Sequence, residues 1–576
     1  MSRFSLVPRV NLPRSKFDLS FEHKTTLNAG KLVPVCVQEI LPGDSLRINQ
    51  TSLIRFASSL VTPLMDNCEL KFEWFFVPNR LVWKNWERMM GQQDEPDDSI
   101  DYLVPSIKNF NTNGDGFFRY LLPPGVGLEF VNILPLRAYA KIYNDWYRDE
   151  NLCGSYKAQC VGLSGDVYKA GVESVLGTDD CSVDASSMGF QFDRSFILAD
   201  RAKKHDYFTS CLPWPQKGPG VELPLGQIAS LNVANDFTMP VLWGDVNYGP
   251  YDQRRHNGSI GNGDSGLVYD NQNVSGIGVS GETFKLATSS TNYNQFSNNS
   301  SSLKTVLTKQ QVENGIQVDL TSATAITINS LRQAFQIQKF YEACARGGTR
   351  YTEIVRSFFG VVSPDARLQR SEYLGGFSSP LQFHSVAQTS ATNETSPQGN
   401  LTSFGIGINQ NKAFSRSFTE HGFVMCLASV VSTPSYSQGL DRYLSRQGRM
   451  DYYWTTFAHL GEQAVLMKEI YAKSAKPNDV FGYQERYAEY RYNSNKLTGQ
   501  MAVDNDLALT SWTLSQKFTS EPALNADFIR ENPPIDRVVA VGSGTGADQF
   551  ILDVYFKIDA VRVMPVYGVP GLVDHF

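Results

Sequence analysis

The chain contains a long run in which apolar and polar residues alternate with the period of two that a β-strand requires. In QFILDVYFKIDAVRVMPV (549–566), one set of alternate positions is wholly apolar: Leu552, Val554, Phe556 and Ile558. The other set is mostly polar: Ile551, Asp553, Tyr555, Lys557 and Asp559. Since side chains of a strand point alternately to its two faces, this run predicts an antiparallel strand with one face in the core and one in solvent.

Other stretches are rich in the β-branched and aromatic residues that favour strands. They are KLVPVCVQEIL (31–41), which a Pro42-Gly43-Asp44 turn follows, CELKFEWFFVP (68–78), LTSFGIGIN (401–409) and GFVMCLASVVS (422–432). The last has a continuous apolar centre, which indicates a strand buried on both faces. We predict that these strands form the core of the protein.

Helical spacing occurs in three shorter places. RLVWKNWERMM (80–90) is the first, and LRAYAKIYNDWYRDEN (136–151) is the second, with Leu136, Tyr139, Ile142, Tyr143 and Trp146 on one face. The third begins at a potential capping residue, Thr327, continues through Ile328, Leu331, Phe335, Gln338, Tyr341 and Ala345, and ends at Gly347 and Gly348. No repeat of 20 to 50 residues is visible, which disfavours propellers and solenoids. A Greek-key sandwich or jelly roll fits the pattern best.

One segment has too few apolar residues to build a core. Between Gly244 and Ser302, 59 residues include 9 Gly, 9 Asn and 10 Ser. A structureless stretch of this length inside a domain is either functional or a flexible linker. We predict a surface insertion, and both interpretations stay open.

The overall composition is that of a folded protein. The 576 residues are 41% hydrophobic and 19% charged, which is enough apolar surface for a large core. The length allows several domains or one elaborated sandwich. A net charge of -6 argues against a protein whose main task is to neutralise nucleic acid, although it allows a local basic patch.

The eight cysteines lie far apart and form no CxxC pair, so they suggest neither a zinc site nor a redox motif. We expect reduced, mostly buried thiols. The N-terminus lacks an apolar signal core, and no run approaches the roughly 18 apolar residues of a membrane span. We therefore expect synthesis and folding in a cytoplasm and no membrane insertion.

Motifs of catalysis are missing from the sequence. It contains no nucleophile elbow, HExxH, Walker A or dinucleotide-binding glycine pattern in a suitable setting. The acidic run DEPDDSID (94–101) could supply the carboxylate pair of a glycosidase, but a solvated loop is the better interpretation. We predict that the protein is not an enzyme and has no cofactor and no metal site.

Two segments interleave cations with aromatic residues, a combination that can neutralise phosphates and stack on unpaired bases. One is the N-terminal 30 residues, predicted to be an extended arm, with Arg3, Arg9, Arg14 and Lys16. The other is RYLSRQGRMDYYW (442–454), where Arg442, Arg446 and Arg449 accompany Tyr443, Tyr452, Tyr453 and Trp454. For both segments, salt bridges between subunits and core aromatics are the competing interpretation, which we favour.

The stretch QAFQIQKFYEACARGGTRYTEIVRSFFGVVSPDARLQRSEYLGG (333–376) closely resembles a signature of the major capsid proteins of microviruses, best matching their gokushovirus branch. Further blocks similar to the family follow one order along the chain, at 14–44, 205–219, 451–465 and 485–499. Departures occur at Ser371, where a proline is common, and at Phe21-Glu22 beside His23. They concern loop geometry and leave the resemblance intact.

The resemblance implies an eight-stranded antiparallel jelly roll with helical excursions and large insertion loops. It also implies a T=1 icosahedral shell of sixty copies around a circular single-stranded DNA genome. In gokushoviruses a large insertion projects at the threefold axes, and we assign that role, with host-receptor contact, to 220–320. The other parts are then the arm (1–30), the first part of the jelly roll with helical insertions (31–219), and the helix with the remaining strands and C-terminal segment (321–576).

The family also implies partners and a place of assembly. Because the subunit carries -6, the genome's phosphates need another source of cations, such as metal ions, polyamines or the small basic packaging protein that such phages encode. Assembly in the bacterial host cytoplasm into a virion is expected. We assign subunit contact and fixation of the insertion to the arginines after 332, namely Arg346, Arg350, Arg356, Arg367 and Arg370.

Two alternatives from other classes remain to be compared with a capsid subunit. A carbohydrate-binding β-sandwich of a cell surface is expected to carry a secretory signal and an independently folding module, and neither is visible. A sandwich hydrolase requires an identifiable carboxylate pair. The capsid subunit is the leading hypothesis.

Overall fold

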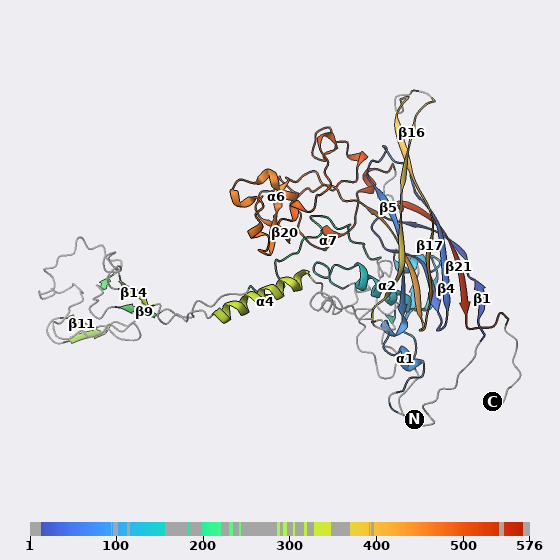
Figure 1. Cartoon of the computed structure of the whole chain (residues 1–576), viewed down its shortest axis with the longest axis horizontal. Helices are drawn as coiled ribbons and strands as arrows, with labels where there is room; N and C mark the ends of the chain where they lie inside the picture. The colour runs from blue at the N-terminus through green and yellow to red at the C-terminus, as the bar shows by residue number, and fades with distance from the viewer. Residues whose placement is uncertain are drawn as a thin grey trace. The chain divides into compact units, whose positions relative to one another are not determined.

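The computed structural model divides the chain by its contacts into two compact units (Figure 1). The first comprises Met1–Pro219 with Lys339–Phe576, and the second is Gly220–Gln338. The structure describes residues 13–93, 95, 102–111, 116–155, 198–220, 328–346, 369–390, 392, 397–540 and 546–567, and the strand segments 183–184, 230–233, 241–243, 285–288, 292–295, 303–305 and 316–319.

Two antiparallel sheets form the centre of the first unit. The six-stranded sheet has the order β1-β21-β4-β17-β16, with β2 also paired to β21. Its strands are β1 (Ser15–Asp18), β2 (Phe21–Leu27), β4 (Ser45–Phe56), β16 (Gln382–Ala387), β17 (Leu401–Ser417) and β21 (Phe550–Arg562). The four-stranded sheet has the order β15-β5-β18-β3. Its strands are β3 (Val33–Ile40), β5 (Cys68–Pro78), β15 (Glu372–Pro380) and β18 (Gly422–Ser432).

The two sheets enclose one hydrophobic core, to which both contribute alternate residues. Trp74 of β5 is fully buried there and packs edge-on against Phe414 of β17 at 5.5 Å and Phe556 of β21 at 5.6 Å between ring centroids. Its indole N–H donates to Gln50 Oε1 on β4 at 3.2 Å, which satisfies the only polar atom of the ring. The architecture is therefore mainly β, with antiparallel sheets packed as a sandwich.

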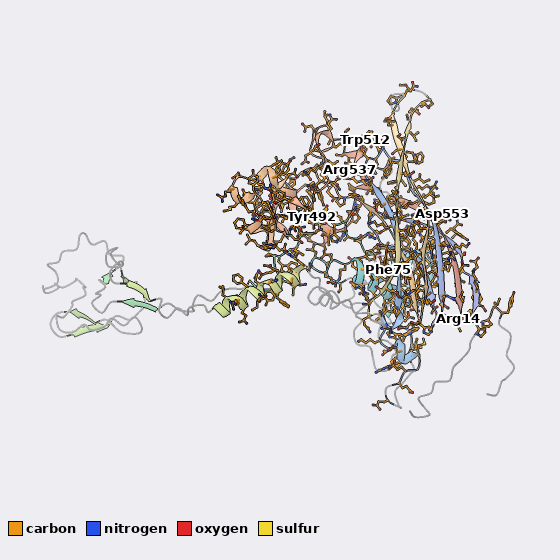
Figure 2. The ribbon with its side chains drawn as sticks, in the orientation of Figure 1. Arg14, Phe75, Tyr492, Trp512, Arg537 and Asp553 are labelled. Atoms are coloured by element: carbon orange, nitrogen blue, oxygen red, sulfur yellow. The ribbon has the colours of Figure 1, made fainter. Side chains whose placement is uncertain are left out.

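A second core covers the other face of the four-stranded sheet. Phe75 of β5 (labelled in Figure 2) and Met425 of β18 pack there against the helix α2 (Leu134–Ile142). All eleven residues of β18 are consequently buried. The predicted burial of this strand on both faces is confirmed.

The six-stranded sheet is covered on one face only. Along β21 the side chains from Phe550 to Ala560 alternate between buried positions and positions that are partly or fully exposed. The predicted half-solvated antiparallel strand is confirmed. Residues 15–27 of the predicted N-terminal arm are strands β1 and β2 of this sheet, because their alternating apolar side chains add to the edge beside β21.

The predicted helices differ from the observed ones in length. In place of one helix over 80–90 there are a 3-10 turn, η2 (Asn79–Leu81), and a single helical turn, α1 (Trp86–Met89). The backbone N–H groups of Val82 and Trp83 both donate to the carbonyl of Asn79. This turn places the Trp83 side chain in the core, and the helix does not continue through it. The second predicted helix starts earlier, at Leu134, and ends in a π-helical turn, η4 (Tyr143–Tyr147).

The long intervals between sandwich strands carry shorter elements. After β5 come η3 (Phe117–Tyr120) and a small sheet of β6 (Ser106–Asn111), β7 (Gly127–Asn132) and β8 (Val183–Asp184). Between β18 and β21 lie β19 (Glu462–Leu466), β20 (Val480–Glu485), α6 (Met467–Ile470) and α7 (Ala526–Ile529). The 3-10 turns of this interval are η8 (Arg442–Ser445), η9 (Arg449–Asp451), η10 (Thr455–Phe457), η11 (Ala488–Tyr490), η12 (Gly499–Met501), η13 (Thr510–Trp512) and η14 (Ile535–Arg537). A third core, which includes Tyr207 and Phe208, holds these elements together.

The second unit contains three two-stranded sheets. They pair β14 (Ile316–Asp319) with β9 (Ser230–Val233), β10 (Val241–Trp243) with β13 (Leu303–Thr305), and β11 (Lys285–Thr288) with β12 (Asn292–Gln295). The chain then enters α4 (Ile328–Arg346), whose bounds agree with the predicted cap and glycine stop. Most of the glycine-rich segment 244–302 lies outside the described residues.

Helix α4 does not bury its predicted apolar face along its whole length. Phe335 is 64% exposed, whereas Ala345 near the C-terminal end is buried. Tyr341 anchors the last turns, because its carbonyl accepts from the backbone N–H of Lys217 at 3.3 Å. The final turns of the helix, which belong to the first unit, are thus held within that unit.

Among the described residues, no helix is long and apolar enough to cross a membrane. The six cysteines in that part of the chain are free thiols, and four of them are buried: Cys36, Cys68, Cys211 and Cys426. Burial raises the pKa of Cys36 to about 12, so this thiol stays protonated at neutral pH. Cys160 and Cys181 lie outside the described residues.

Candidate interaction surfaces

An exposed group of aromatic residues lies in the interval between β18 and β21. We call it the aromatic–arginine surface; its exposed members are Tyr443, Leu444, Arg449, Tyr452, Tyr453, Trp454, Tyr490 and Tyr492, and the buried side chains of Arg446 and Tyr487 lie beneath them. The rings of Tyr453 and Tyr487 lie 4.9 Å apart, and Tyr452, Tyr490 and Tyr492 are each more than half exposed. Exposed large apolar side chains gathered in this way make the surface a candidate contact site.

Two of the three arginines predicted for nucleic-acid binding here are already paired within the chain. Arg442 donates to Glu469 at 3.0 Å, and Arg446 donates to Glu489 at 3.0 Å. Arg446 also stacks on Tyr490, with its guanidinium carbon 4.6 Å from the ring centroid. These contacts neutralise both cations, so their geometry fits structural roles better than phosphate binding.

Arg449 is the exception within this surface. Its guanidinium lies over the Trp454 ring at 5.2 Å, and no carboxylate of the described part of the chain pairs with it. An arginine stacked on tryptophan fits both a protein partner and a nucleic-acid base.

The buried carboxylate below this surface has an altered acidity. Burial raises the pKa of Glu469, although Arg442, the Leu466 backbone N–H and the Tyr207 hydroxyl all act in the opposite direction. The Tyr207 hydroxyl donates to Glu469 at 2.9 Å. The carboxylate thereby joins Arg442 to the third core and fixes the base of the aromatic–arginine surface.

The predicted cations of the N-terminal segment are only partly described. Lys16 pairs with Asp559 of β21 at 2.7 Å, and Arg14 lies close to the turn at Gly43. Arg3 and Arg9 lie outside the described residues. Lys16 therefore has an intramolecular partner, and its predicted role in nucleic-acid contact stays a prediction.

The arginines predicted for subunit contact are similarly divided. Arg346, at the end of α4, pairs with Glu462, and Arg370 lies 5.0 Å from the Trp146 ring centroid. Arg350, Arg356 and Arg367 lie outside the described residues. The Arg346–Glu462 pair joins the end of α4 to β19, and the predicted role of these arginines in subunit contact and fixation of the insertion stays a prediction.

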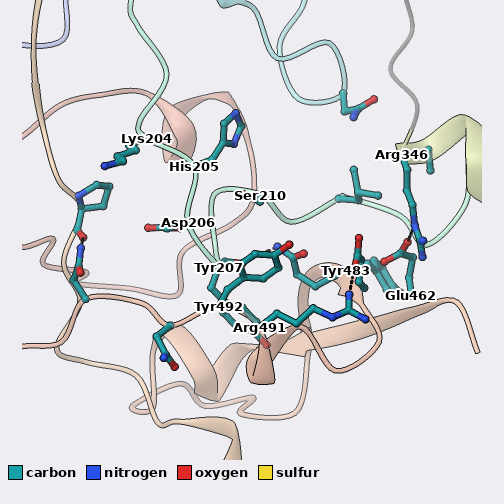
Figure 3. Close-up of a pocket in the computed structure, with 18 of the residues that line it drawn as sticks. Lys204, His205, Asp206, Tyr207, Ser210, Arg346, Glu462, Tyr483, Arg491 and Tyr492 are labelled. Carbon is teal, nitrogen blue, oxygen red and sulfur yellow. Dashed lines mark hydrogen bonds and ion pairs between the residues drawn. The ribbon is translucent and has the colours of Figure 1, made fainter. Parts of the chain in front are cut away.

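A cleft of about 810 Å³ lies beside that pair (Figure 3). Its walls include Lys204, His205, Tyr207, Tyr483 and Tyr492. Four charged residues of the walls form two ion pairs, Arg346 with Glu462 and Arg491 with Glu485. Within the described residues, no three His, Cys, Asp or Glu side chains group closely enough to hold a metal ion. Of the acidic run 94–101, only Glu95 belongs to the described part.

The sequence interpretation missed one further group of cations, on the face of the six-stranded sheet that points away from the core. We call it the outer face, and its central members are Arg47 and Arg55 of β4, Lys412 of β17, and Tyr555 and Lys557 of β21. The alternation in SLRINQTSLIRF (45–56) was visible and could have revealed Arg47 and Arg55. Their grouping with Lys412 and Lys557 depends on strand pairing, which the sequence does not display.

A mainly β antiparallel sandwich is an architecture found in structural proteins such as viral capsid subunits. The comparisons with known proteins specify that class. The model of the family described as "Capsid protein (F protein)" matches residues 5–572. The chain therefore belongs to this family of capsid proteins.

Three individual relatives align with this chain over nearly the whole length of both proteins. Capsid protein VP1 of Bdellovibrio phage phiMH2K is 39% identical, over 100% of this chain and 98% of the relative. Capsid protein VP1 of Chlamydia phage 1 is 39% identical, over 99% and 98%. Capsid protein VP1 of Spiroplasma virus 4 is 32% identical, over 99% and 97%. The chain is a major capsid protein of the microvirus type, a structural protein of the virion rather than an enzyme, and the predicted gokushovirus likeness is confirmed.

Proposed function

We propose that this protein is the subunit of a T=1 icosahedral shell in which sixty copies enclose a circular single-stranded DNA genome, and that it folds as an eight-stranded jelly roll. The observation that carries the fold is the pairing of strands across the chain. In order, the sandwich strands are β2, β3, β4, β5, β15, β17, β18 and β21. The first pairs with the last, the second with the seventh, the third with the sixth and the fourth with the fifth.

That nested pairing is what a long antiparallel hairpin produces when it rolls into two sheets. The strands β1 and β16 then extend the six-stranded sheet at its ends. Jelly rolls of this kind are the usual building unit of viral capsids, and the family membership agrees with it. The insertions after β5 and β18 leave the nested order unchanged.

Assembly needs surfaces that lose solvent when copies meet. The aromatic–arginine surface fits this role, because exposed Tyr, Trp and Arg side chains dominate the energetics of protein interfaces. Leu444, 60% exposed, and the neighbouring Met450, 56% exposed, add aliphatic surface of the kind that a protein partner buries. Arg446 of this surface and Arg442 beneath it are paired with carboxylates, which favours a second copy of this chain over a polyanion as the partner.

The roles of the remaining segments follow from the proposed shell. Gly220–Gln338 separates by its contacts from the first unit, which supports an insertion that carries the threefold protrusion and the host contact. The Arg346–Glu462 pair supports fixation of that insertion by the end of α4, with Arg350, Arg356, Arg367 and Arg370 proposed for subunit contact. With a net charge of -6, single subunits should bind DNA weakly, and a small basic packaging protein is the proposed source of further cations.

Electron microscopy of the purified protein tests the proposal. Closed particles of uniform diameter with protrusions at the threefold axes are the expected result. Deletion of 244–302 should leave the particles closed and abolish their binding to host cells. Soluble monomers at every protein and salt concentration, with the basic partner present, would contradict shell assembly, and tight salt-sensitive DNA binding by monomers would contradict the weak-binding expectation.

A further inference from the structure

The outer face of the six-stranded sheet presents several cationic side chains to solvent, at alternate positions along neighbouring strands. Along β4 the even-numbered residues from Leu46 to Phe56 are buried, so the odd-numbered residues point outward. Arg47 and Arg55 are exposed among them. Lys557 of β21 and Lys412 of β17 are exposed on the same side.

The strand register brings three of these cations around one residue. Asn49 of β4 lies opposite Lys557 on β21 and opposite Lys412 on β17. Neighbouring strands lie about 4.8 Å apart, and Arg47 is two residues from Asn49, about 7 Å along the same strand. Three positive charges thus surround Asn49 on an open sheet face.

The carboxylates of this face are engaged by groups of β1 and β2, and Asp559 also lies opposite Arg47 in the strand register. Asp559 pairs with Lys16 at 2.7 Å, and Asp553 lies 3.5 Å from Lys24, which also pairs with Glu22. The hydrogen bond from Ser20 holds the pKa of Asp18 below its usual value, with a smaller contribution from the charge of Lys557. In the described part of the chain, no carboxylate lies within ion-pair distance of Arg47, Arg55 or Lys412. The face therefore keeps an excess of positive charge in a chain whose net charge is negative.

Aromatic side chains occur between the cations. Tyr555 is 46% exposed and faces Thr51 of β4 and Glu22 of β2. Farther along the sheet, Phe404 is 48% exposed and stacks on His384 at 5.3 Å. An unpaired base can stack on such rings while neighbouring cations neutralise its phosphates. Figure 2 labels Asp553, which lies two residues from Tyr555 along β21.

We propose that the outer face of the six-stranded sheet binds the single-stranded DNA genome, with phosphates on Arg47, Arg55, Lys412 and Lys557 and a base stacked on Tyr555. This inference rests on the proposed genome enclosure. The two surfaces differ in whether their arginines and lysines are paired with carboxylates. At the aromatic–arginine surface Arg446 is neutralised by Glu489, and Arg442 beneath it by Glu469, which suits a protein. On the outer face Arg47, Arg55 and Lys412 have no carboxylate within ion-pair distance among the described residues, which suits a polyanion.

The test compares two charge-matched triple variants in particles produced with the genome and the packaging partner. One variant carries Arg47→Gln, Lys412→Gln and Lys557→Gln. The control carries Lys473→Gln, Lys476→Gln and Lys517→Gln, which removes three exposed cations from the interval between β18 and β21. DNA content per particle and the salt concentration that releases DNA from opened particles are measured.

We expect closed particles from both variants and reduced DNA retention only in the outer-face variant. For binding to single strands, the slope of log affinity against log salt should fall by about 0.7 for each phosphate contact removed. Normal DNA content and an unchanged slope would overturn the inference while leaving shell assembly intact. Failure of the outer-face variant alone to form particles would also overturn it, since it would identify the face as a contact between copies.

Ultraviolet cross-linking of unaltered virions provides a second measurement that does not depend on any variant. A DNA adduct on the β21 peptide that contains Tyr555 is the expected result. Adducts confined to peptides of the aromatic–arginine surface would contradict the assignment. If the unaltered protein forms no closed particles, the proposed function itself fails, and the two failures are thereby distinguishable.

Discussion

The two sheets of the sandwich differ in what covers them. The four-stranded sheet packs against the other sheet on one side and against α2 and its neighbours on the other, so β18 is buried at every position. The six-stranded sheet buries one face and exposes the other, as the alternation along β21 shows. The first sheet is therefore constrained by packing on both faces, whereas the described residues of the outer face of the second sheet are open to solvent and can change with little effect on the core.

The largest expected effect comes from the core between the sheets. Trp74→Ala removes a fully buried ring that contacts Phe414 and Phe556 and should cost about 3 to 5 kcal/mol of unfolding free energy. Tyr555→Ala on the outer face is the control and should change stability by no more than about 0.5 kcal/mol. Denaturant unfolding of the subunit measures both, and equal losses would remove the distinction between the sheets.

A buried ion pair on the four-stranded sheet comes next. Arg201 and the Tyr147 hydroxyl both donate to Glu73, and the side chains of Arg201 and Glu73 are 15% and 21% exposed. Glu73→Gln leaves the guanidinium without its counter-charge and should cost about 3 kcal/mol at neutral pH. Glu22→Gln, which alters an exposed pair on the six-stranded sheet, should produce no measurable change.

The same pair predicts a dependence on pH. Burial alone would raise the pKa of Glu73, but hydrogen bonding and the charge of Arg201 outweigh it and leave the pKa below its usual value. The stabilisation is therefore complete above the usual glutamate pKa of about 4.3 and is lost as the pH falls through the lowered value. The difference between the variant and the unaltered protein should shrink in acid, and a difference that grows there would contradict this sign.

The hydroxyl group of Tyr139 contributes to the packing of α2 on the four-stranded sheet, and its removal tests that packing. Tyr139 of α2 donates to the carbonyl of Leu32 at 2.8 Å and accepts from the backbone N–H of Ala199 at 2.9 Å. Tyr139→Phe should cost about 1 to 3 kcal/mol, because it leaves two buried backbone groups unsatisfied. Tyr555→Phe is the matched change on the outer face, and thermal unfolding of the two variants should show a loss only for the first.

The smallest expected effect on stability belongs to the aromatic–arginine surface. Tyr443 and Leu444 are 59% and 60% exposed, so changing both to Ser should alter unfolding free energy by no more than about 0.5 kcal/mol. The fraction of protein in closed particles, measured by sedimentation, should nevertheless fall strongly. Leu444→Met keeps the apolar surface and should assemble normally. Normal assembly of the Ser variant would exclude this surface as a contact between copies.

Local patterns predicted many single elements of the structure. The bounds of β5, β18 and α4 and the alternation of β21 agree with the sequence interpretation, because period and end signals are contained in neighbouring residues. The single helix predicted over 80–90 was wrong, since the burial of Trp83 interrupts it. The π-helical end of the second helix also had no visible signal.

Features that depend on distant partners were not predictable in this way. The pairing of β2 with β21 joins the two ends of the chain. The carboxylate partners of Arg442 and Arg446 lie on α6 and η11, beyond the reach of any local pattern. For the same reason the cations around Asn49 were missed, although Arg47 and Arg55 were visible in the alternation of β4.

A comparison of DNA-filled and empty particles by cryo-electron microscopy tests the central claim most directly. We expect closed shells in which the outer face of the six-stranded sheet lines the interior. Additional density should lie against Arg47, Lys412 and Lys557 in filled particles and be missing from empty ones. An outer face covered by a neighbouring subunit, or turned to the exterior of the shell, would contradict the account.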